Sequence, residues 1–338
     1  MEDPKTITYS QVQGLDIKVD LFLPKSLPTG SHPSIVFIHG GGMIAGNREG
    51  LASQQWLLDT CATHSIPFLS TDHRLIYPST GFDIISDARS LLSFLASPSI
   101  SPHLPPNTSL DPTRIALTGE SGGGYMAYAA ALYANPKPCA VLQQYAMGGN
   151  LLLDHWIKPN GVACPGGNVP EERLESLMRE GRVVADDPLG GYAPGRDPRD
   201  DSGRLGLWAR WVRRGEVVDY VLGVEGLSRS LAQFVGVRER EEHLPKEVRR
   251  AVLHLNVEGG VPPMLLVHGV EDELVPVEES RTMHEKWLAC EGKSELMAVE
   301  GAGHALRTPG TMGQWMQGIE EIRASMARWL LEQLQVKK

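Results

Sequence analysis

Three residues that lie far apart in the sequence have the side chains of a nucleophile, an acid and a base. Ser121 lies in the segment GESGG (119–123), Asp272 lies in a loop segment with two further acids, and His304 ends the segment GAGH. A serine hydroxyl becomes a nucleophile when an imidazole takes its proton, and a carboxylate orients that imidazole. These residue types therefore predict acyl transfer through a covalent intermediate on Ser121.

A run of three glycines follows His39, and about 0.01 such runs are expected by chance from 11 histidines and 36 glycines in 338 residues. Glycines let the backbone turn its N–H groups toward a reacting carbonyl, and two or three such donors form an oxyanion hole. We expect these donors to be the N–H groups of Gly41, Gly42 and Gly122. A phosphate-binding glycine loop is the competing interpretation, which is weak because no G-x-G-x-x-G pattern or Walker lysine accompanies the run.

Each of these signals is ambiguous when it is taken alone. A G-x-S-x-G match is a weak pattern, a loop histidine is unremarkable, and Glu271 and Glu273 compete with Asp272 for the role of the acid. The order along the chain is serine, acid, histidine, which is the α/β-hydrolase order, whereas chymotrypsin-like and subtilisin-like proteases use other orders. Because each residue also follows a predicted strand, we take Ser121, Asp272 and His304 as the catalytic residues.

The elements that must position these residues are short apolar strands that alternate with helical patterns. Strands are expected over 15–23, 34–38, 67–70, 114–118, 140–142, 264–267 and 296–299. Apolar residues recur at spacings of three and four over 84–95, 283–288 and 319–330, which predicts helices. Such alternation favours an α/β fold with a mainly parallel central sheet that helices cover on both faces.

One region, residues 150–255, breaks the alternation and contains no convincing buried strand. We interpret it as an inserted helical cap, with residues 1–149 and 256–338 forming the catalytic domain, and we expect a loop over 186–204 because that stretch is rich in Gly, Pro and Asp. The candidates for the wall of a substrate pocket are Met43, Trp208, Trp211 and Tyr220. The alternative is that the aromatic residues form only the core of the cap.

The sequence resembles the hormone-sensitive-lipase-like branch of α/β-hydrolase esterases, and the stretch 261–304 is similar to fungal α/β-hydrolases of this type. The resemblance rests on the HGGG and GESGG segments and the serine, acid, histidine set, together with DHRL (72–75), which is similar to the family's D-Y-R-L segment, and Asp87 in the helix that follows. It implies an α/β-hydrolase fold, with DHRL and Asp87 supporting loops rather than chemistry. Two departures concern Met43, where the family often has an aromatic residue, and His73, which replaces the tyrosine.

Composition excludes several other classes of protein. The net charge of −9 argues against nucleic acid and anionic membranes as partners, and the four cysteines form no C-x-x-C pair. We expect no metal and no organic cofactor, because the proposed chemistry needs neither. The N-terminus has no apolar signal segment and the longest apolar run has ten residues (125–134), so we expect a cytoplasmic protein without a membrane span. The sequence leaves open whether the protein forms a homodimer.

The expected function is a serine hydrolase that cleaves the carboxylic ester of a small molecule. The same residues could instead cleave a thioester, a lactone or a C–C bond in a biosynthetic, polyketide-like intermediate. A third alternative is a non-catalytic small-molecule receptor on the same fold. Peptide hydrolysis ranks low, because the loops lack a second domain for peptide capture.

Overall fold

The computed structural model of the chain describes residues 1–189, 202–310 and 313–336, and it is built around one eight-stranded sheet. The strand order is β1-β2-β4-β3-β5-β6-β7-β8, in which β1, β2 and β4 pair antiparallel and the strands from β4 to β8 run parallel. The strands are β1 (Lys5–Val12), β2 (Leu15–Phe22), β3 (Gly30–Ile38), β4 (Phe68–Thr71), β5 (Thr108–Glu120), β6 (Ala140–Gln144), β7 (Met264–Gly269) and β8 (Ser294–Val299).

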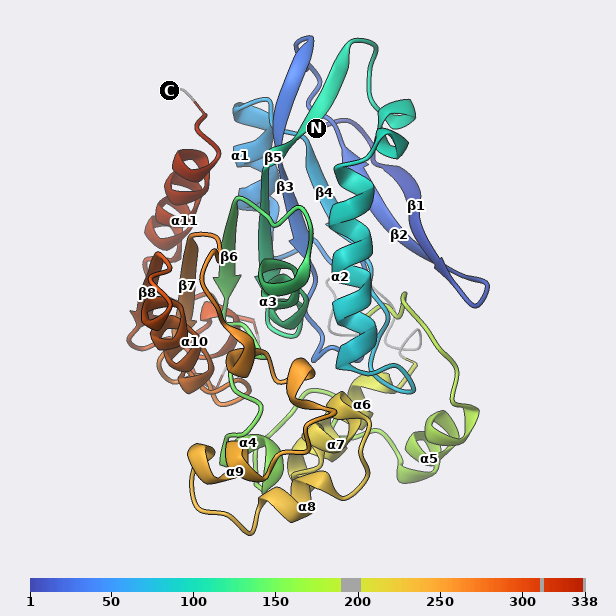
Figure 1. Cartoon of the computed structure of the whole chain (residues 1–338), viewed down its shortest axis with the longest axis vertical. Helices are drawn as coiled ribbons and strands as arrows, with labels where there is room; N and C mark the ends of the chain where they lie inside the picture. The colour runs from blue at the N-terminus through green and yellow to red at the C-terminus, as the bar shows by residue number, and fades with distance from the viewer. Residues whose placement is uncertain (190–201, 311–312, 337–338) are drawn as a thin grey trace.

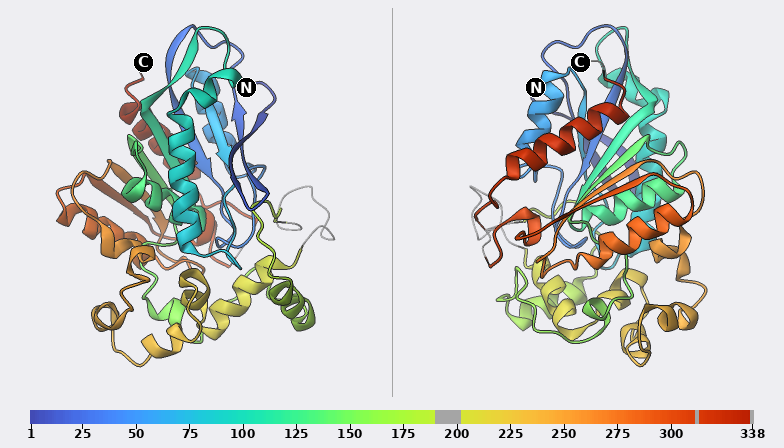
Figure 2. Two further views of the ribbon diagram at one scale, coloured as in Figure 1. Left: turned by 45° about the vertical axis from the view of Figure 1, so that its right-hand side comes forward. Right: turned by 90° about the vertical axis from the view of Figure 1, so that its left-hand side faces the viewer.

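Helices cover both faces of the sheet, and each face has its own hydrophobic core (Figures 1 and 2). One core includes side chains from α2 (Gly81–Leu95), α3 (Gly123–Tyr133) and α10 (Glu278–Ala289). The other includes side chains from α1 (Gln55–Thr63) and α11 (Ile319–Gln333). The strands β4, β6 and β7 are buried along their whole length, including the polar residues near their carboxyl ends, as expected for central strands that helices cover on both faces.

The expected α/β architecture is confirmed, and the two largest differences in the strands concern β1 and the start of β5. The edge strand β1 was not predicted, because only Ile7 and Tyr9 are fully buried in it and its other residues are polar, exposed or, for Val12, half-buried. Strand β5 begins at Thr108, six residues before the predicted start, because its polar first half pairs with the start of β3. Neither difference changes the carboxyl end of a strand.

Helices fill the segment between β6 and β7, and no strand interrupts them in its described part. These helices are α4 (Asp154–Ile157), α5 (Glu171–Glu180), α6 (Arg204–Arg214), α7 (Val217–Leu222), α8 (Leu227–Leu231) and α9 (Val237–His243). They lie together beyond one end of the sheet, at the bottom of Figure 1. Most of the predicted loop 186–204 lies outside the described residues, and α6 begins at its last residue.

The described residues also contain short 3-10 helices. They are η1 (Pro98–His103), η4 (Arg249–Ala251), η5 (Leu253–Asn256) and η6 (His304–Leu306). Among the helices of the described ranges, none combines the length and the apolar character that crossing a membrane requires.

Candidate active site

The residues that could do chemistry lie at the carboxyl ends of neighbouring parallel strands. The glycine run follows β3, Ser121 follows β5, Asp272 comes three residues after β7, and His304 comes five residues after β8. In the sheet these strands are neighbours in the order β3, β5, β6, β7, β8, so their carboxyl ends meet at one edge. The fold therefore brings together segments that are up to 265 residues apart, from His39 to His304.

Ser121 occupies a sharp turn between β5 and α3. Its φ of 49° lies in the left-handed region, which a residue with a side chain rarely adopts. The turn is held by hydrogen bonds: the Ser121 N–H donates to Gln144 O at 3.0 Å, and Ser121 O accepts from Gly124 and Met147 at 3.0 and 2.8 Å. This strand–turn–helix geometry presents the hydroxyl at the start of a helix, as a nucleophile elbow does.

A continuous chain of hydrogen bonds joins the three predicted side chains. His304 Nε2 lies 3.0 Å from Ser121 Oγ, and His304 Nδ1 lies 2.8 Å from Asp272 Oδ2. The other carboxylate oxygen, Asp272 Oδ1, accepts the backbone N–H groups of Leu274 and Val275, each at 2.9 Å. These bonds fix the carboxylate, and the carboxylate in turn fixes the plane of the imidazole.

The surroundings of Asp272 keep it ionised. Its burial works against the charge, but the two imidazoles of His304 and His268 outweigh this effect and hold its pKa well below the usual range. His268 Nε2 lies 2.8 Å from Val275 O and 3.3 Å from Asp272 Oδ2, and both of these oxygens only accept. His268 therefore carries its proton on Nε2, and its Nδ1 accepts the Ser280 hydroxyl at 2.7 Å.

The glycine run packs tightly against the turn that carries Ser121. Gly41 and Gly42 have φ values of +110° and +62°, which favour glycine. A Cβ on Gly122 would lie 2.3 Å from the nitrogen of Met43, and one on Gly42 would lie 2.6 Å from the indole of Trp208. Within the described residues, the N–H groups of Gly41, Gly42 and Gly122 donate no hydrogen bond. Three backbone donors are thus available beside the serine.

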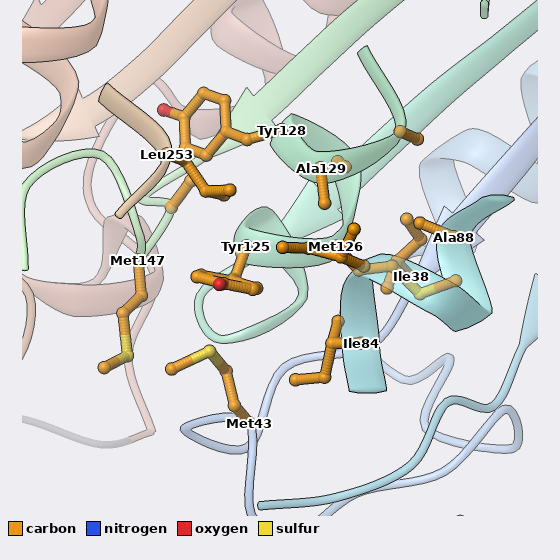
Figure 3. Close-up of a cluster of buried hydrophobic side chains, with 14 of the residues drawn as sticks. Ile38, Met43, Ile84, Ala88, Tyr125, Met126, Tyr128, Ala129, Met147 and Leu253 are labelled. Carbon is orange, nitrogen blue, oxygen red and sulfur yellow. The ribbon is translucent and has the colours of Figure 1, made fainter. Parts of the chain in front are cut away.

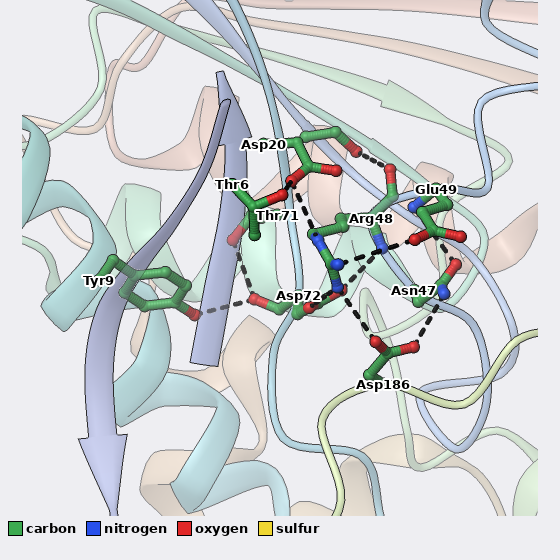
Figure 4. Close-up of polar contacts among 10 residues, drawn as sticks. Thr6, Tyr9, Asp20, Asn47, Arg48, Glu49, Thr71, Asp72 and Asp186 are labelled. Carbon is green, nitrogen blue, oxygen red and sulfur yellow. Dashed lines mark hydrogen bonds and ion pairs between the residues drawn. The ribbon is translucent and has the colours of Figure 1, made fainter. Parts of the chain in front are cut away.

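A buried ion-pair network holds the end of this loop (Figure 4). Arg48 forms ion pairs with Asp20 at 3.1 Å, Asp72 at 2.8 Å and Asp186 at 3.1 Å. The Arg48 N–H also donates to Asp72 Oδ1 at 2.7 Å, so one carboxylate orients both the backbone and the side chain. Because Asp186 belongs to the insertion between β6 and β7, the network connects the loop both to the sheet and to that insertion.

Two further buried arginines hold neighbouring segments in place, one from the insertion and one within the sheet domain. Arg204 of α6 donates to the carbonyl oxygens of Ile44 and Ile76, at 2.9 and 2.7 Å. Arg74 pairs with Asp87 of α2 at 2.7 Å. These contacts agree with the supporting role that the resemblance implies for the DHRL segment and for Asp87.

A cavity of about 510 Å³ opens over Ser121 and His304. Its wall combines the glycine run, apolar residues from the insertion, and a polar corner near His304. Its lining residues are Gly40, Gly41, Gly42, Gly50, Ala52, Ser53, Glu120, Ser121, Tyr145, Pro165, Leu189, Leu205, Trp208, Leu274, His304, Ala305, Arg307, Gly313 and Trp315. This volume falls within the range of small-molecule sites.

Of the four predicted pocket residues, only Trp208 lines this cavity. Trp211 and Tyr220 stack on each other with ring centroids 3.9 Å apart, so they form part of the insertion's own core. Met43 is buried in the hydrophobic cluster that also contains Tyr125, and its side chain points toward the other members of that cluster (Figure 3). Met43, Trp211 and Tyr220 are therefore not among the residues that line this cavity.

Sequence reasoning missed five polar or aromatic residues in the lining, namely Ser53, Glu120, Tyr145, Arg307 and Trp315. The Tyr145 ring packs edge-on against the His304 imidazole, with centroids 5.1 Å apart, and its hydroxyl donates to Glu120 Oε2 at 2.9 Å. Glu120 and Tyr145 stand at the ends of β5 and β6, a position that could have identified them. Nothing in the sequence pattern singled out Arg307 or Trp315.

Two buried imidazoles stack beneath the glycine run. The rings of His39 and His73 lie 4.8 Å apart and nearly parallel, at 8°. Each Nδ1 bonds to a carbonyl oxygen, of Gly40 at 2.7 Å and of Arg74 at 2.9 Å. Burial, and for His39 the neighbouring imidazole, lowers the pKa of His39 to about 3 and that of His73 to about 4. Both rings are therefore neutral near pH 7.

This pair predicts a loss of stability in acid. In the unfolded chain both imidazoles take up protons below about pH 6.5, while the folded protein keeps them neutral down to about pH 4 and 3. The free energy of unfolding is therefore unaffected by these two imidazoles above about pH 6.5, and it decreases as the pH falls below that value. Replacing His73 by tyrosine should reduce the drop in unfolding free energy between pH 8 and pH 5 by about 2 kcal/mol.

The measurement is urea denaturation of the wild type and the His73→Tyr variant at both pH values. His103→Asn is a matched control, because His103 is half-exposed and lies in η1, away from the stacked pair. Equal pH dependence in wild type and His73→Tyr would contradict the argument, whatever the absolute stability of the variant.

Comparisons with known proteins agree with this geometry. Residues 19–150 match the family model BD-FAE, an α/β-hydrolase-type domain. The "Non-reducing polyketide synthase pkbA" of Emericella nidulans is 26% identical over 342 residues, which cover 89% of this chain and 13% of that protein. The chain thus spans only a small part of the polyketide synthases that it matches. "Probable carboxylesterase M8" of Phoma sp. is 24% identical over 323 residues and matches along 91% of both chains.

Solved structures with the same fold include esterases. Est2 of Thermogutta terrifontis, determined with butyrate bound, has a TM-score of 0.59 and 18% identity over 98% of this chain and 94% of that one. An alpha/beta hydrolase superfamily protein from Enterococcus faecalis has a TM-score of 0.63 and 16% identity over 97% of this chain and 98% of that one. These structures show that the chain has the fold of α/β hydrolases, and the family match and the carboxylesterase relative are similar to it in sequence.

Proposed function

We propose that the protein hydrolyses the carboxylic ester of a small molecule through an acyl-enzyme on Ser121. The observation that carries this proposal is the hydrogen-bonded chain from Ser121 through His304 to Asp272, at 3.0 and 2.8 Å, beside three backbone N–H groups that have no acceptor in the part of the chain that the structure describes. The cavity above Ser121 provides space for the substrate.

In the first step the Ser121 hydroxyl attacks the ester carbonyl and His304 takes its proton. His304 Nδ1–H donates to Asp272 Oδ2, which leaves the Nε2 lone pair facing Ser121 Oγ. The ionised Asp272 stabilises the imidazolium that forms. The protonated imidazole then gives its proton to the leaving alcohol as the carbon–oxygen bond breaks.

In the tetrahedral intermediates the negative oxygen would lie among the N–H groups of Gly41, Gly42 and Gly122. Preorganised donors of this kind stabilise charge that develops in the transition state, and each contributes on the order of 10²–10³ in rate. In the second step His304 activates a water molecule, which attacks the acyl-enzyme and releases the acid and the free serine.

The insertion (residues 150–255) is proposed as a cap over this site, and residues 1–149 and 256–338 as the catalytic domain. Its residues Pro165, Leu189, Leu205 and Trp208 line the cavity, so it supplies part of the substrate-binding wall. Arg204 and Asp186 attach it to the loop that carries the oxyanion donors.

A fluorophosphonate probe tests the proposal directly, because it reacts covalently with an activated serine. A structural neighbour, Thermogutta terrifontis esterase 2, is phosphonylated by sarin. We expect one adduct per chain, located on Ser121 by mass spectrometry, and none in Ser121→Ala. Absence of labelling, combined with retained binding of a small molecule, would contradict the proposal and would favour a receptor on the same fold.

A second candidate is cleavage of an acyl thioester, a lactone or an activated C–C bond in a polyketide-like intermediate. It is favoured by the similarity to non-reducing polyketide synthases, which extends over 89% of the chain. The same serine chemistry would serve with a thiol, an alkoxide or a stabilised carbanion as the leaving group. Relative kcat/KM values on matched aryl esters, aryl thioesters and lactones distinguish these activities from simple ester hydrolysis.

A further inference from the structure

Arg307 lines the cavity close to His304, and no acidic side chain of the described residues pairs with it. Arg307 lies three residues after His304, on a short segment whose bridge to Trp315 fixes its position. Its guanidinium carbon lies 4.3 Å from the centroid of the Trp315 ring, and Arg307 and Trp315 both line the cavity. Stacking on an indole holds a guanidinium in place but uses none of its five N–H donors.

Within the described residues the Arg307 side chain forms no ion pair and donates no hydrogen bond, although it lies at the wall of a cavity that contains an acid. Arg323 provides the contrast. Its guanidinium carbon lies 4.4 Å from the centroid of the same Trp315 ring, but its guanidinium pairs with Glu320 at 2.7 Å. Arg323 does not line the cavity. Only Arg307 of the two therefore offers its donors to an occupant of the cavity.

The acid in the lining already has its hydrogen-bond partners. Glu120 Oε2 accepts the Ser53 hydroxyl at 2.9 Å, the Gln54 amide at 2.8 Å and the Tyr145 hydroxyl at 2.9 Å. Burial and Glu120 itself raise the pKa of Tyr145 well above its ordinary value, so its hydroxyl remains a donor. One oxygen of Glu120 thus has three donors, whereas the five N–H groups of Arg307 have no acceptor within the described residues, and an anionic oxygen group would satisfy them.

The rest of the wall is apolar where the insertion and the loop after β7 contribute to it. Leu189, Leu205, Trp208 and Leu274 lie there, and Ser121 lies in the same lining as these residues and Arg307. An occupant that fits all of these surfaces has an apolar body, a reacting carbonyl and an anionic group.

We infer that the substrate is an ester that also carries a carboxylate, which Arg307 binds while the apolar body lies against the insertion. This inference rests on the proposed function and specifies its substrate class. A planar guanidinium can bind a carboxylate with two parallel hydrogen bonds, which makes it a specific reader of that group.

The test uses two pairs of esters that differ by a carboxylate. On the acyl side these are the mono-para-nitrophenyl ester of terephthalic acid and para-nitrophenyl benzoate, and on the alcohol side para-carboxyphenyl butyrate and phenyl butyrate. For each pair the ratio of kcat/KM for the charged ester to that for the neutral ester is measured in wild type, Arg307→Gln and Arg323→Gln. The two variants remove the same charge and the same indole contact, but only one removes a donor from the cavity.

In Arg307→Gln we expect this ratio to fall 10- to 100-fold in at least one pair, which corresponds to the loss of a charge-assisted hydrogen bond. In Arg323→Gln it should stay within about threefold of wild type. Equal ratios in wild type and Arg307→Gln for both pairs would overturn the inference while leaving ester hydrolysis intact.

A binding measurement separates this failure from failure of the proposed function. Calorimetric titration of Ser121→Ala and of Ser121→Ala/Arg307→Gln with both charged esters needs no turnover. Weaker binding in the double variant supports the inference even if no ester is hydrolysed, whereas equal binding overturns it. Failure of the proposed function appears instead as absence of both turnover and Ser121 labelling.

Discussion

Replacing Ser121 by alanine should lower kcat/KM for para-nitrophenyl butyrate by a factor on the order of 10⁴–10⁶. The variant removes the only atom that can form the acyl-enzyme, while His304, Asp272 and the backbone donors stay in place. What activity remains would come from the oxyanion donors acting on a bound ester and water. The measurement is steady-state hydrolysis at pH 8, with circular dichroism to confirm the fold.

Ser121→Gly provides the matched control, because the φ of 49° at this position costs free energy for any residue with a Cβ. The glycine variant should be as inactive as the alanine variant but more stable than it by about 1 kcal/mol in chemical denaturation. Loss of activity without a gain in stability would show that the turn is not strained. Activity of Ser121→Ala near the wild-type level would remove the basis for the mechanism.

The arrangement of the site could be predicted from the sequence because each chemical group follows a strand of apolar residues. In a parallel sheet such positions meet at one edge, so the ends of β3, β5, β7 and β8 were sufficient to bring His304 near Ser121. Position after the strand favoured Asp272 without excluding Glu271 and Glu273, and in the structure it is Asp272 that contacts His304.

The walls of the cavity could not be predicted in this way, because they depend on how helices without a regular order pack together. Trp208 and Trp211 are three residues apart on α6, yet one lines the cavity and the other stacks on Tyr220. Arg307 enters the lining through its bridge to Trp315, a contact that no periodicity in the sequence indicates. The edge strand β1 escaped prediction for a related reason, since an edge needs only a few buried residues.

Replacing Gly122 by alanine should lower kcat/KM by about 10²–10³-fold, which is the effect of losing one oxyanion donor. The backbone of Gly122 has φ −56° and ψ −29°, so alanine fits its conformation without strain and is the better helix former. The added Cβ would however lie 2.3 Å from Met43 N and 2.8 Å from Gly42 N. Both are backbone atoms, so the glycine run has to move away from Ser121.

This substitution changes the position of the oxyanion donors and leaves the nucleophile, Ser121, in the protein. In Gly122→Ala the loss should appear mainly in kcat, because the donors act on charge that develops only in the transition state. Gly259→Ala is the control, since a Cβ there meets no atom within 4 Å and its backbone φ is not left-handed. If Gly122→Ala hydrolysed para-nitrophenyl butyrate as fast as Gly259→Ala, the Gly42 and Gly122 N–H groups would not be the groups that stabilise the oxyanion, and the proposed position of the reacting carbonyl would be wrong.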